Sequence, residues 1–273
     1  MHLVFDIGGT NMRLAISKDG QILDQTETVP TPKDFDRGIY TIKSVADKLS
    51  GEIKIQKIAG GIAGPVDRER TKLISSPHIP QWVNQPFKQK LEEVFDAPVI
   101  LDNDCKLIAL GEATAGAGKD KQIVAYLGIG TGVGGARIVN NKIDENALGF
   151  EPGHQIIVPD GNLCNCTGKG HLEAYVGGGY FEKIYGQKGE NIKDPKIWDE
   201  VAKYLAIGVN NTIVHWSPDI VVLGGSVMKS LSIDLIQGHL KQELTIFPVM
   251  PEIIPAQLED SGGLYGALQL LKN

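Results

Sequence analysis

The sequence predicts an α/β fold made of two similar lobes, and three observations support this. Short apolar runs alternate with segments whose apolar residues recur at helical spacing, as in folds with parallel strand pairing at the centre. A weak internal repeat relates the first half of the chain to the second. With 273 residues, 42% of them hydrophobic, the chain suits one large domain or two small ones sharing a cleft.

In the first half of the chain, apolar runs predict strands and the Asp19-Gly20 pair predicts a hairpin turn. The expected strands are 2–7, 14–16, 22–29, 58–62 and 98–101, and 72–74 is expected to pair back across the turn near 67–68. Helical spacing of apolar residues predicts helices over 33–49, 86–95 and 104–115.

The second half continues the alternation. The expected strands are 123–127, 136–139 and 220–223, and Asn140-Asn141 is a turn signal. The expected helices are 196–216, 229–242 and 264–271.

The internal repeat has a constant offset of 122 residues. Each copy reads as an apolar strand, a turn of glycine and threonine, and a returning strand. The aligned residues are Ile7, Gly8, Leu14 and Ile16 in the first copy and Ile129, Gly130, Ala136 and Ile138 in the second.

Composition excludes several classes of protein. A net charge of −6 spread along the chain argues against nucleic-acid binding, which needs a concentrated basic patch. No segment approaches the ~20 apolar residues of a membrane span, and residues 1–5 are too short for a signal peptide. The odd count of three cysteines indicates reduced thiols or metal ligands, so we expect a cytoplasmic protein.

The two repeated turns are candidate phosphate sites. Glycines let backbone N–H groups converge into an anion-binding nest, and threonine adds a hydroxyl donor. Asp6, directly before the first turn, can hold Mg²⁺ through water. Either turn alone is better interpreted as an ordinary hairpin, but the two turns together with Asp6 favour binding of a polyphosphate. The candidate residues are Gly8, Gly9 and Thr10 in the first turn and Gly130, Thr131 and Gly132 in the second.

Two other glycine motifs compete with this interpretation. Residues 130–135 match the dinucleotide fingerprint, but that fingerprint opens a helix, whereas 136–143 reads as a strand. A dehydrogenase therefore requires 136–143 to be helical. Neither Gly118-Lys119 nor Gly168-Lys169 is followed by the hydroxyl residue of a Walker loop.

A third glycine element, Gly224-Gly225, follows the strand expected at 220–223. It is either a simple strand-to-helix turn or an open surface for an adenine ring.

Asp102, Asn103 and Asp104 follow a buried strand and open a helix. One of them is expected to cap the helix. Ligands of α/β folds gather at the carboxyl ends of strands, so a further carboxylate there can act as general base in phosphoryl transfer.

Cys164, Cys166 and His171 have metal-ligand spacing, but no second close pair of ligands follows. The alternative is two buried thiols beside a histidine that faces solvent.

Six motifs in order make the chain resemble the ROK family of sugar kinases and related repressors. They are DIGGT, the NDxxxxALGE run at 103–112, GIGTGVGG, ExGH at 151–154, CxC with GxLEAY, and LGG. The resemblance covers residues 3 to about 271 and implies the actin-like (ribonuclease H-like) hexokinase fold, with two lobes and an interlobe cleft. We expect the small lobe to comprise 1–108 with 260–273, and the large lobe, which carries the zinc segment, to comprise 109–259.

The resemblance also implies residue roles. Asp6 would assist Mg²⁺, the two turns would hold ATP phosphates, and Gly224 and Gly225 would lie near the adenosine. Asp104 would be the base that takes a proton from a sugar hydroxyl, usually that on C6. The sugar would be bound by Asn103, Asp104, Glu151, His154 and Glu173, with Gly64 in a turn at the rim of the pocket.

Zinc is implied at the family's histidine and three cysteines, spaced H-x9-C-x-C-x4-C. The matching residues here are His154, Cys164, Cys166 and, in place of the last cysteine, His171. Two cysteines with two histidines form an established structural zinc set.

The resemblance predicts an ATP- and Mg²⁺-dependent hexokinase of glucokinase type that forms a homodimer or homotetramer. Fructose, mannose or an N-acetylhexosamine are alternatives to glucose, and polyphosphate is an alternative donor. A sugar-responsive regulator without catalysis is the rival from another class; such regulators carry a DNA-binding segment before DIGGT, and only five residues precede Asp6 here.

Overall fold

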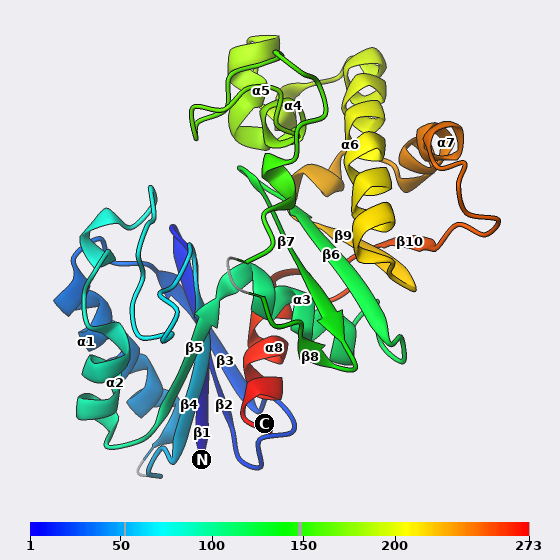
Figure 1. Ribbon diagram of the computed structural model, residues 1–273. Coiled ribbons are helices and arrows are strands. Elements are labelled where there is room, and N and C mark those ends of the chain that lie inside the picture. Colours follow the sequence, from blue (N-terminus) through cyan, green and yellow to red (C-terminus); the bar gives the residue numbers. More distant parts are fainter. Residues whose placement is uncertain (52, 147–148, 273) are drawn as a thin grey trace. The chain divides into compact units, whose positions relative to one another are not determined.

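The protein is described by a computed structural model that covers residues 1–51, 53–146 and 149–272. Contacts divide the chain into two compact units, Met1–Thr114 with Asp260–Asn273, and Ala115–Glu259. This boundary and the one expected at residue 108 both fall within helix α3 (Asp104–Ala115). In Figure 1 the first unit runs from blue to blue-green and includes the red C-terminal helix, and the second runs from green to orange.

The first unit is built on a five-stranded sheet of order β3-β2-β1-β4-β5. Strand β1 pairs antiparallel with β2 and parallel with β4, which in turn pairs parallel with β5. The strands are β1 (His2–Ile7), β2 (Asn11–Ser17), β3 (Gln25–Pro30), β4 (Lys57–Ile62) and β5 (Val99–Asn103).

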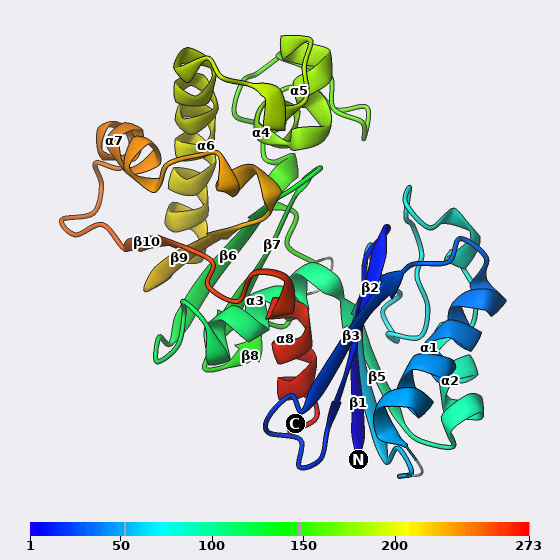
Figure 2. The same ribbon diagram turned by 180° about the vertical axis from the view of Figure 1, so that it is seen from behind.

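Helices cover both faces of this sheet, as the two opposite views show (Figures 1 and 2). Helices α1 (Phe35–Ser50) and α2 (Phe87–Phe95) pack on one face, and α8 (Gly262–Leu270) packs against β1 and β4 on the other. The Asp34 side chain caps α1 by accepting a hydrogen bond from the Arg37 amide. Strands buried on both faces read as continuous apolar runs, which is why β1 was recognisable in the sequence.

The second unit contains another five-stranded sheet, of order β10-β9-β6-β7-β8. Strand β6 pairs antiparallel with β7 and parallel with β9, so read from β8 this sheet repeats the topology of the first. The strands are β6 (Ile123–Ile129), β7 (Val133–Val139), β8 (Lys142–Ile143), β9 (Ile220–Gly224) and β10 (Glu252–Pro255).

The helices of the second unit lie between β8 and β10 in the sequence. They are α4 (Glu173–Val176), α5 (Gly178–Tyr185), α6 (Pro195–Trp216) and α7 (Ile233–Glu243). Asp194 caps α6, and the buried side of α6 packs into the apolar core of the unit. The described residues also form short 3₁₀ turns at Pro80–Trp82, Pro152–His154, Gly189–Asn191, Ser226–Lys229 and Glu259–Ser261.

Several sequence expectations need correction in detail. The strand expected from residue 14 begins at Asn11. The strand expected from residue 136 begins at Val133, because Gly134 and Gly135 pair with β6 in the ladder and do not form a turn. The helix expected from residue 229 begins at Ile233, because Ser232 caps it. The strands β8 and β10 and the helices α4 and α5 were not anticipated.

Residues 136–143 are not helical, since they lie in β7, a turn and β8. Asn140 and Asn141 form that turn with positive φ angles, as the sequence signal indicated. The geometry that a dinucleotide fingerprint requires is therefore lacking at residues 130–135.

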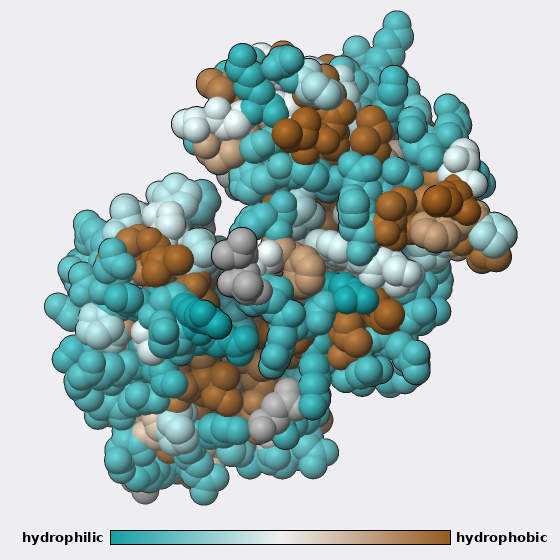
Figure 3. Space-filling model, in the orientation of Figure 1, coloured by the Kyte–Doolittle hydropathy of each residue, from teal (hydrophilic) through white to brown (hydrophobic). Residues whose placement is uncertain are grey.

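None of the described helices has the length and apolar character needed to cross a membrane. Figure 3 shows a surface that is mainly hydrophilic, with hydrophobic side chains in small separate groups.

Candidate functional site

The three polar residues at the end of β5 form the acidic part of the first unit. Asn103 Oδ1 accepts the Lys106 amide at 3.2 Å, so Asn103 is the residue that caps α3. With its orientation set in this way, Asn103 Nδ2 donates to the Gly64 carbonyl at 2.9 Å and to Asp104 Oδ1 at 3.0 Å. The cap therefore fixes the direction of the Asp104 carboxylate.

Gly64 is required in this arrangement. Its φ is +128°, and a Cβ there would lie 2.3 Å from the Ser75 carbonyl oxygen. The turn that places the Gly64 carbonyl beside Asn103 therefore has no room for another residue type.

Asp104 and Asp6 have raised pKa values. Burial, and secondly the negative charge of Asp6, raise the pKa of Asp104 to about 7, although amide donors including that of Cys105 oppose the shift. Burial raises the pKa of Asp6 to about 6, with Arg13 opposing the shift. An aspartate that titrates near neutral pH can accept a proton effectively in catalysis.

Asp102 differs from its neighbours because its side chain is fully buried. Its Oδ1 accepts the Asn103 amide at 2.8 Å, and cationic groups of Arg70 and Lys106 lie 3.3 Å and 3.6 Å from its carboxylate oxygens. Asp102 therefore anchors the strand end, while Asp104 is only half-buried.

The first glycine turn connects β1 and β2. The Gly8 amide donates to the Asn11 carbonyl at 2.9 Å, so this N–H closes the turn. Gly9 is confined, since a Cβ would lie 2.3 Å from His78 Cβ. Lys33 Nζ holds the carbonyls of Gly9 and His78 together, at 3.1 Å and 2.9 Å. Thr10 is exposed at the tip of the turn.

The second glycine turn connects β6 and β7 in the same way. The Gly130 amide donates to the Gly132 carbonyl at 2.9 Å, and Thr131 is exposed. Gly225, with φ of +93°, approaches the same point, because its Cβ would lie 2.3 Å from the Ile129 carbonyl oxygen. Gly224 pairs in parallel register with Gly128. The structure thus brings the LGG element next to the second turn.

A glycine run that the sequence interpretation missed supports the second turn. The amides of Gly178 and Gly179, which open α5, donate to the carbonyls of Gly130 and Thr131 at 2.8 Å and 2.9 Å. Gly177 lies close enough that its Cβ would be 3.0 Å from the Thr131 carbonyl oxygen. The signal was three consecutive glycines, residues 177–179, which follow the LEAY motif after one valine.

The predicted metal ligands converge in the second unit. Ligand atoms of His154, Cys164, Cys166 and His171 all lie within 4.8 Å of one another. His154 Nδ1 is 3.4 Å from His171 Nδ1, Cys164 Sγ is 3.8 Å from His154 Nδ1, and Cys166 Sγ is 3.2 Å from His171 Nδ1. His171 therefore occupies the place expected for a fourth ligand and does not face solvent alone.

These separations fit a tetrahedral ion. Zinc bonds of about 2.05 Å to nitrogen and about 2.3 Å to sulfur place two nitrogens roughly 3.3 Å apart, and nitrogen and sulfur roughly 3.6 Å apart. The observed distances lie close to both values. Both histidines approach through Nδ1, which leaves Nε2 of His154 for another partner.

Local backbone structure explains why the ligands meet. Isolated bridges join Ile156 to His171 and Leu163 to Lys169. They fold residues 156–171, here named the cysteine segment, back on themselves. Gly168 lies within this fold, where a Cβ would be 2.3 Å from the ring of His171. A larger residue at 168 would thus push His171 away from the cysteines.

Glu173 links the cluster of two histidines and two cysteines to the second turn. Its Oε2 accepts the Val133 amide at 2.9 Å and would collide with a Cβ on Gly132. Its Oε1 lies 3.8 Å from Cys164 Sγ and 3.4 Å from the hydroxyl of Tyr180. Burial, and secondly the hydrogen bond with Cys164, raise the pKa of Tyr180, so that it remains a hydroxyl donor.

Glu151 is exposed at the start of the 3₁₀ turn that carries His154, and its carbonyl accepts the His154 amide at 3.0 Å. That turn packs on β7, since a Cβ on Gly153 would lie 2.2 Å from the Val133 carbonyl oxygen. The first unit thus gathers Gly64, Asn103 and Asp104, and the second gathers His154, Glu173 and the cysteines, with Glu151 one turn away.

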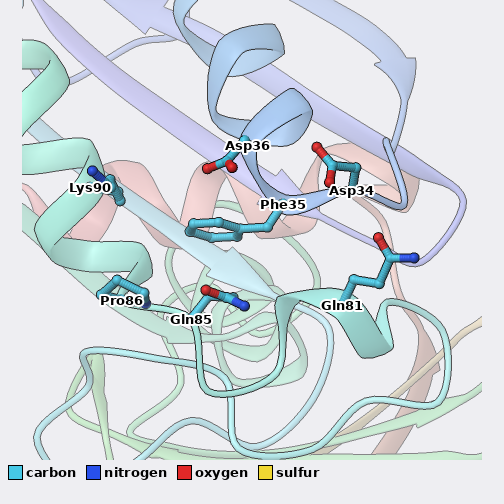
Figure 4. A pocket seen from close by; sticks show the side chains of 7 residues that line it. All are labelled: Asp34, Phe35, Asp36, Gln81, Gln85, Pro86 and Lys90. Atoms are coloured by element: carbon cyan, nitrogen blue, oxygen red, sulfur yellow. The ribbon is translucent and has the colours of Figure 1, made fainter.

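A separate pocket of about 320 Å³ opens on the first unit beside the start of α1 (Figure 4). No predicted site residue lines it. Its walls are Asp34, Phe35, Asp36, Gln81, Gln85, Pro86 and Lys90. Asp34 is already engaged there as the cap of α1.

Comparison with known proteins places the whole chain among sugar kinases. It is 29% identical to a glucokinase of Streptomyces coelicolor, covering 98% of this chain and 96% of the relative. It is also 29% identical to an N-acetyl-D-glucosamine kinase of Vibrio atlanticus, covering 98% of each chain.

Solved structures agree with this result. A ROK hexokinase from Thermus thermophilus superposes with a TM-score of 0.89 at 27% identity, covering 99% of this chain and 98% of the other. A ROK glucokinase from Streptomyces griseus, in complex with glucose and AMPPNP, gives a TM-score of 0.81 at 27% identity and covers 98% of each chain. The predicted actin-like α/β fold is thereby confirmed. The profile of the ROK family matches residues 3–273, and the chain belongs to that family.

Proposed function

We propose that this chain is an ATP-dependent hexose kinase, with glucose as the first expected substrate and the C6 hydroxyl as the acceptor. The observation that carries the proposal is Asp104, a half-buried carboxylate at a strand end, oriented by Asn103 and with a pKa of about 7. The glucokinase relative and the glucokinase structure with glucose and AMPPNP support the choice of substrates.

In the reaction, the ionised Asp104 carboxylate accepts the proton of the C6 hydroxyl as that oxygen attacks the γ-phosphorus of ATP. The bond between the γ-phosphorus and the oxygen bridging to the β-phosphate breaks, and ADP leaves. Asn103 keeps Oδ1 of Asp104 in place through its 3.0 Å hydrogen bond. Gly64 is part of the same hydrogen-bonded group, at the edge of the sugar site.

The nucleotide is assigned to the two turns. Gly9 and Thr10, and likewise Thr131 and Gly132, contribute amide or hydroxyl donors to the phosphates, while Gly8 and Gly130 close the turns. Gly224 and Gly225 provide a surface without side chains for the adenosine. Asp6 would hold magnesium through water, and the ion would neutralise charge on the phosphates.

Glu151, His154 and Glu173 are assigned to the hydroxyls of the sugar ring. His154 uses Nδ1 in the metal cluster, so its Nε2 is the atom that would reach a hydroxyl. His154, Cys164, Cys166 and His171 would hold the metal, and zinc is the ion that this donor set fits best. The bound ion would supply the rigidity that orients His154.

An N-acetylhexosamine is the second candidate substrate, because an N-acetylglucosamine kinase matches the chain as well in identity and coverage as the glucokinase does. Fructose and mannose are further candidate acceptors, and polyphosphate is the alternative phosphate donor. We further propose a homodimer or homotetramer without a nucleic-acid or membrane partner. A cytoplasmic location fits a site that needs Cys164 and Cys166 in the reduced state.

The test is ADP release from MgATP by the purified, zinc-loaded chain with glucose, mannose, fructose, GlcNAc and ManNAc in turn. We expect one sugar to be clearly preferred and its 6-phosphate to accumulate in equal amount to ADP. A reaction without sugar, which measures ATP hydrolysis alone, is the control. If folded protein gives no sugar-dependent ADP, the kinase proposal is overturned; polyphosphate as donor and a sugar-responsive binding role are then tested.

A further inference from the structure

We propose that Tyr180 is a positioning residue that holds the Glu173 carboxylate and the Cys164 sulfur in one hydrogen-bonded unit. Tyr180 lies in α5 and its side chain is 3% exposed. The part of this inference that concerns sugar binding rests on the proposed function. The part that concerns the metal cluster stands independently of it.

Three hydrogen bonds meet at the Tyr180 hydroxyl. The oxygen accepts the amide of Asn165, the residue between the two cysteines, at 2.7 Å. The hydroxyl proton faces two acceptors, Cys164 Sγ at 3.3 Å and Glu173 Oε1 at 3.4 Å. A single side chain therefore contacts the backbone of the cysteine segment, a metal ligand and a carboxylate assigned to the sugar.

A hydroxyl has only one proton, so the two acceptors share it. The Asn165 amide fixes the position of the oxygen, and the proton then lies between sulfur and carboxylate. Glu173 is held from its other side by the Val133 amide, at 2.9 Å from Oε2. The carboxylate is thus fixed at both oxygens, one through the strand β7 and one through Tyr180.

Helix α5 extends this connection to the second glycine turn. Its first amides, those of Gly178 and Gly179, hold the carbonyls of Gly130 and Thr131, and Tyr180 follows directly. These amide bonds do not involve the hydroxyl. Loss of the hydroxyl should therefore weaken the binding of the sugar and of the metal ion, and should leave the structure of the second glycine turn unchanged.

The test is Tyr180→Phe in the full, zinc-loaded chain, because phenylalanine keeps the buried ring and removes only the hydroxyl. Zinc transfer to the chelator 4-(2-pyridylazo)resorcinol should become roughly tenfold faster, as is usual when a partner of a metal ligand is removed. The charge-transfer band between thiolate and cobalt should shift in cobalt-loaded protein. The KM for the hexose should rise roughly tenfold, while the KM for ATP stays unchanged.

Tyr175→Phe is the matched control. Tyr175 is also buried and its hydroxyl also accepts a backbone amide of this segment, that of Asn162 at 2.8 Å. That hydroxyl has no contact with Cys164 or Glu173 among the described interactions. Zinc release, the cobalt spectrum and the KM for the hexose should all remain as in the wild type.

A double variant separates positioning from general loosening of the core. If Tyr180 acts on the sugar through Glu173, Tyr180→Phe should raise the KM for the hexose little further in a Glu173→Gln background. Full additivity, or equal effects of the two tyrosine variants, would overturn the proposal, as would wild-type zinc release in Tyr180→Phe. If the wild type phosphorylates no sugar, the zinc and cobalt measurements still decide the metal part.

Discussion

The two units share one sheet topology but carry different chemistry on it. At the repeat offset of 122, Asp6 in β1 corresponds to Gly128 in β6, and Gly9 in the first turn corresponds to Thr131 in the second. The first unit therefore has a buried acid before its turn, and the second has none there. The two hairpins therefore have the same backbone plan but different side chains in and directly before the turn.

The larger difference lies in the connection that follows the hairpin. In the first unit β3 leads through α1 alone to β4. In the second, the chain between β8 and β9 carries the cysteine segment, α4, α5 and α6. Because that segment has few buried apolar residues of its own, metal ligation is a physical means of ordering it.

The hairpin and its turn are common to both units, whereas the candidate site residues lie at a strand end in the first unit and in the long connection in the second. In the first unit the candidate residue is Asp104, directly after β5, and in the second it is the group formed by Glu173 and the two histidines and two cysteines that could hold a metal ion. Four perturbations test this division.

The largest effect is expected for Asp104→Asn, which removes the proton acceptor and keeps the shape of the side chain. Loss of a general base lowers kcat by roughly 10²–10⁴-fold, while the hexose still binds. Steady-state kinetics together with sugar titration by calorimetry measure both quantities. Asp96→Asn, the same change at an exposed acid of the same unit, should be neutral. If Asp104→Asn keeps the kcat of the wild type, Asp104 is not the general base.

The second perturbation addresses the metal cluster. His171→Ala should lose the single zinc ion per chain and lower the melting temperature, because a structural zinc contributes folding free energy directly. His171→Cys should keep the ion, since three cysteines with one histidine also form a zinc set. His239→Ala, an imidazole of the same unit outside the cluster, is the control. Elemental analysis with one zinc retained in His171→Ala would show that His171 is not a ligand.

The third perturbation compares two glycines of the second turn. A Cβ on Gly132 would lie 2.3 Å from Glu173 Oε2, whereas a Cβ on Gly130 would meet nothing within 4 Å. Because the clashing atom is the end of a side chain, Gly132→Ala should displace the Glu173 carboxylate from its position at the Val133 amide. A lost hydrogen bond to a charged group costs about 1.5–3 kcal/mol, and about 1.4 kcal/mol corresponds to tenfold in binding. Gly132→Ala should therefore raise the KM for the hexose roughly tenfold or more, and Gly130→Ala should not. If both variants have the same KM for the hexose, Glu173 does not take part in binding the sugar.

The smallest effect concerns pH. Since the pKa of Asp104 is raised to about 7, its basic form grows with pH, and kcat/KM should rise through pH 7 and then level off. Asp6→Asn removes a negative charge that raises this pKa, so the inflection should move to lower pH after each profile is scaled to its own plateau. A profile that does not move would show that Asp6 does not act on Asp104.

Much of the molecule was predictable from local patterns. The hairpins around both turns, the helix that begins at Asp104, and the Asn140-Asn141 turn follow from apolar periodicity and from residues that favour particular φ angles. The aspartate at a strand end was also visible, because strand, cap and carboxylate are adjacent in the sequence. Short elements such as β8, with two residues, and α4, with four, are below the length at which a period can be recognised.

By itself, the sequence determined the α/β class, the repeated turns, the family and the residue types and spacing of the candidate metal ligands, because these depend on residue type and spacing over a few positions. Tertiary structure alone decided that Asn103 is the cap that orients Asp104, that Gly8 and Gly130 close their turns, and that Tyr180 reaches both Cys164 and Glu173. The physical reason is that hydrogen bonding and desolvation depend on distances set by the packed fold, and spacing along the chain does not encode them.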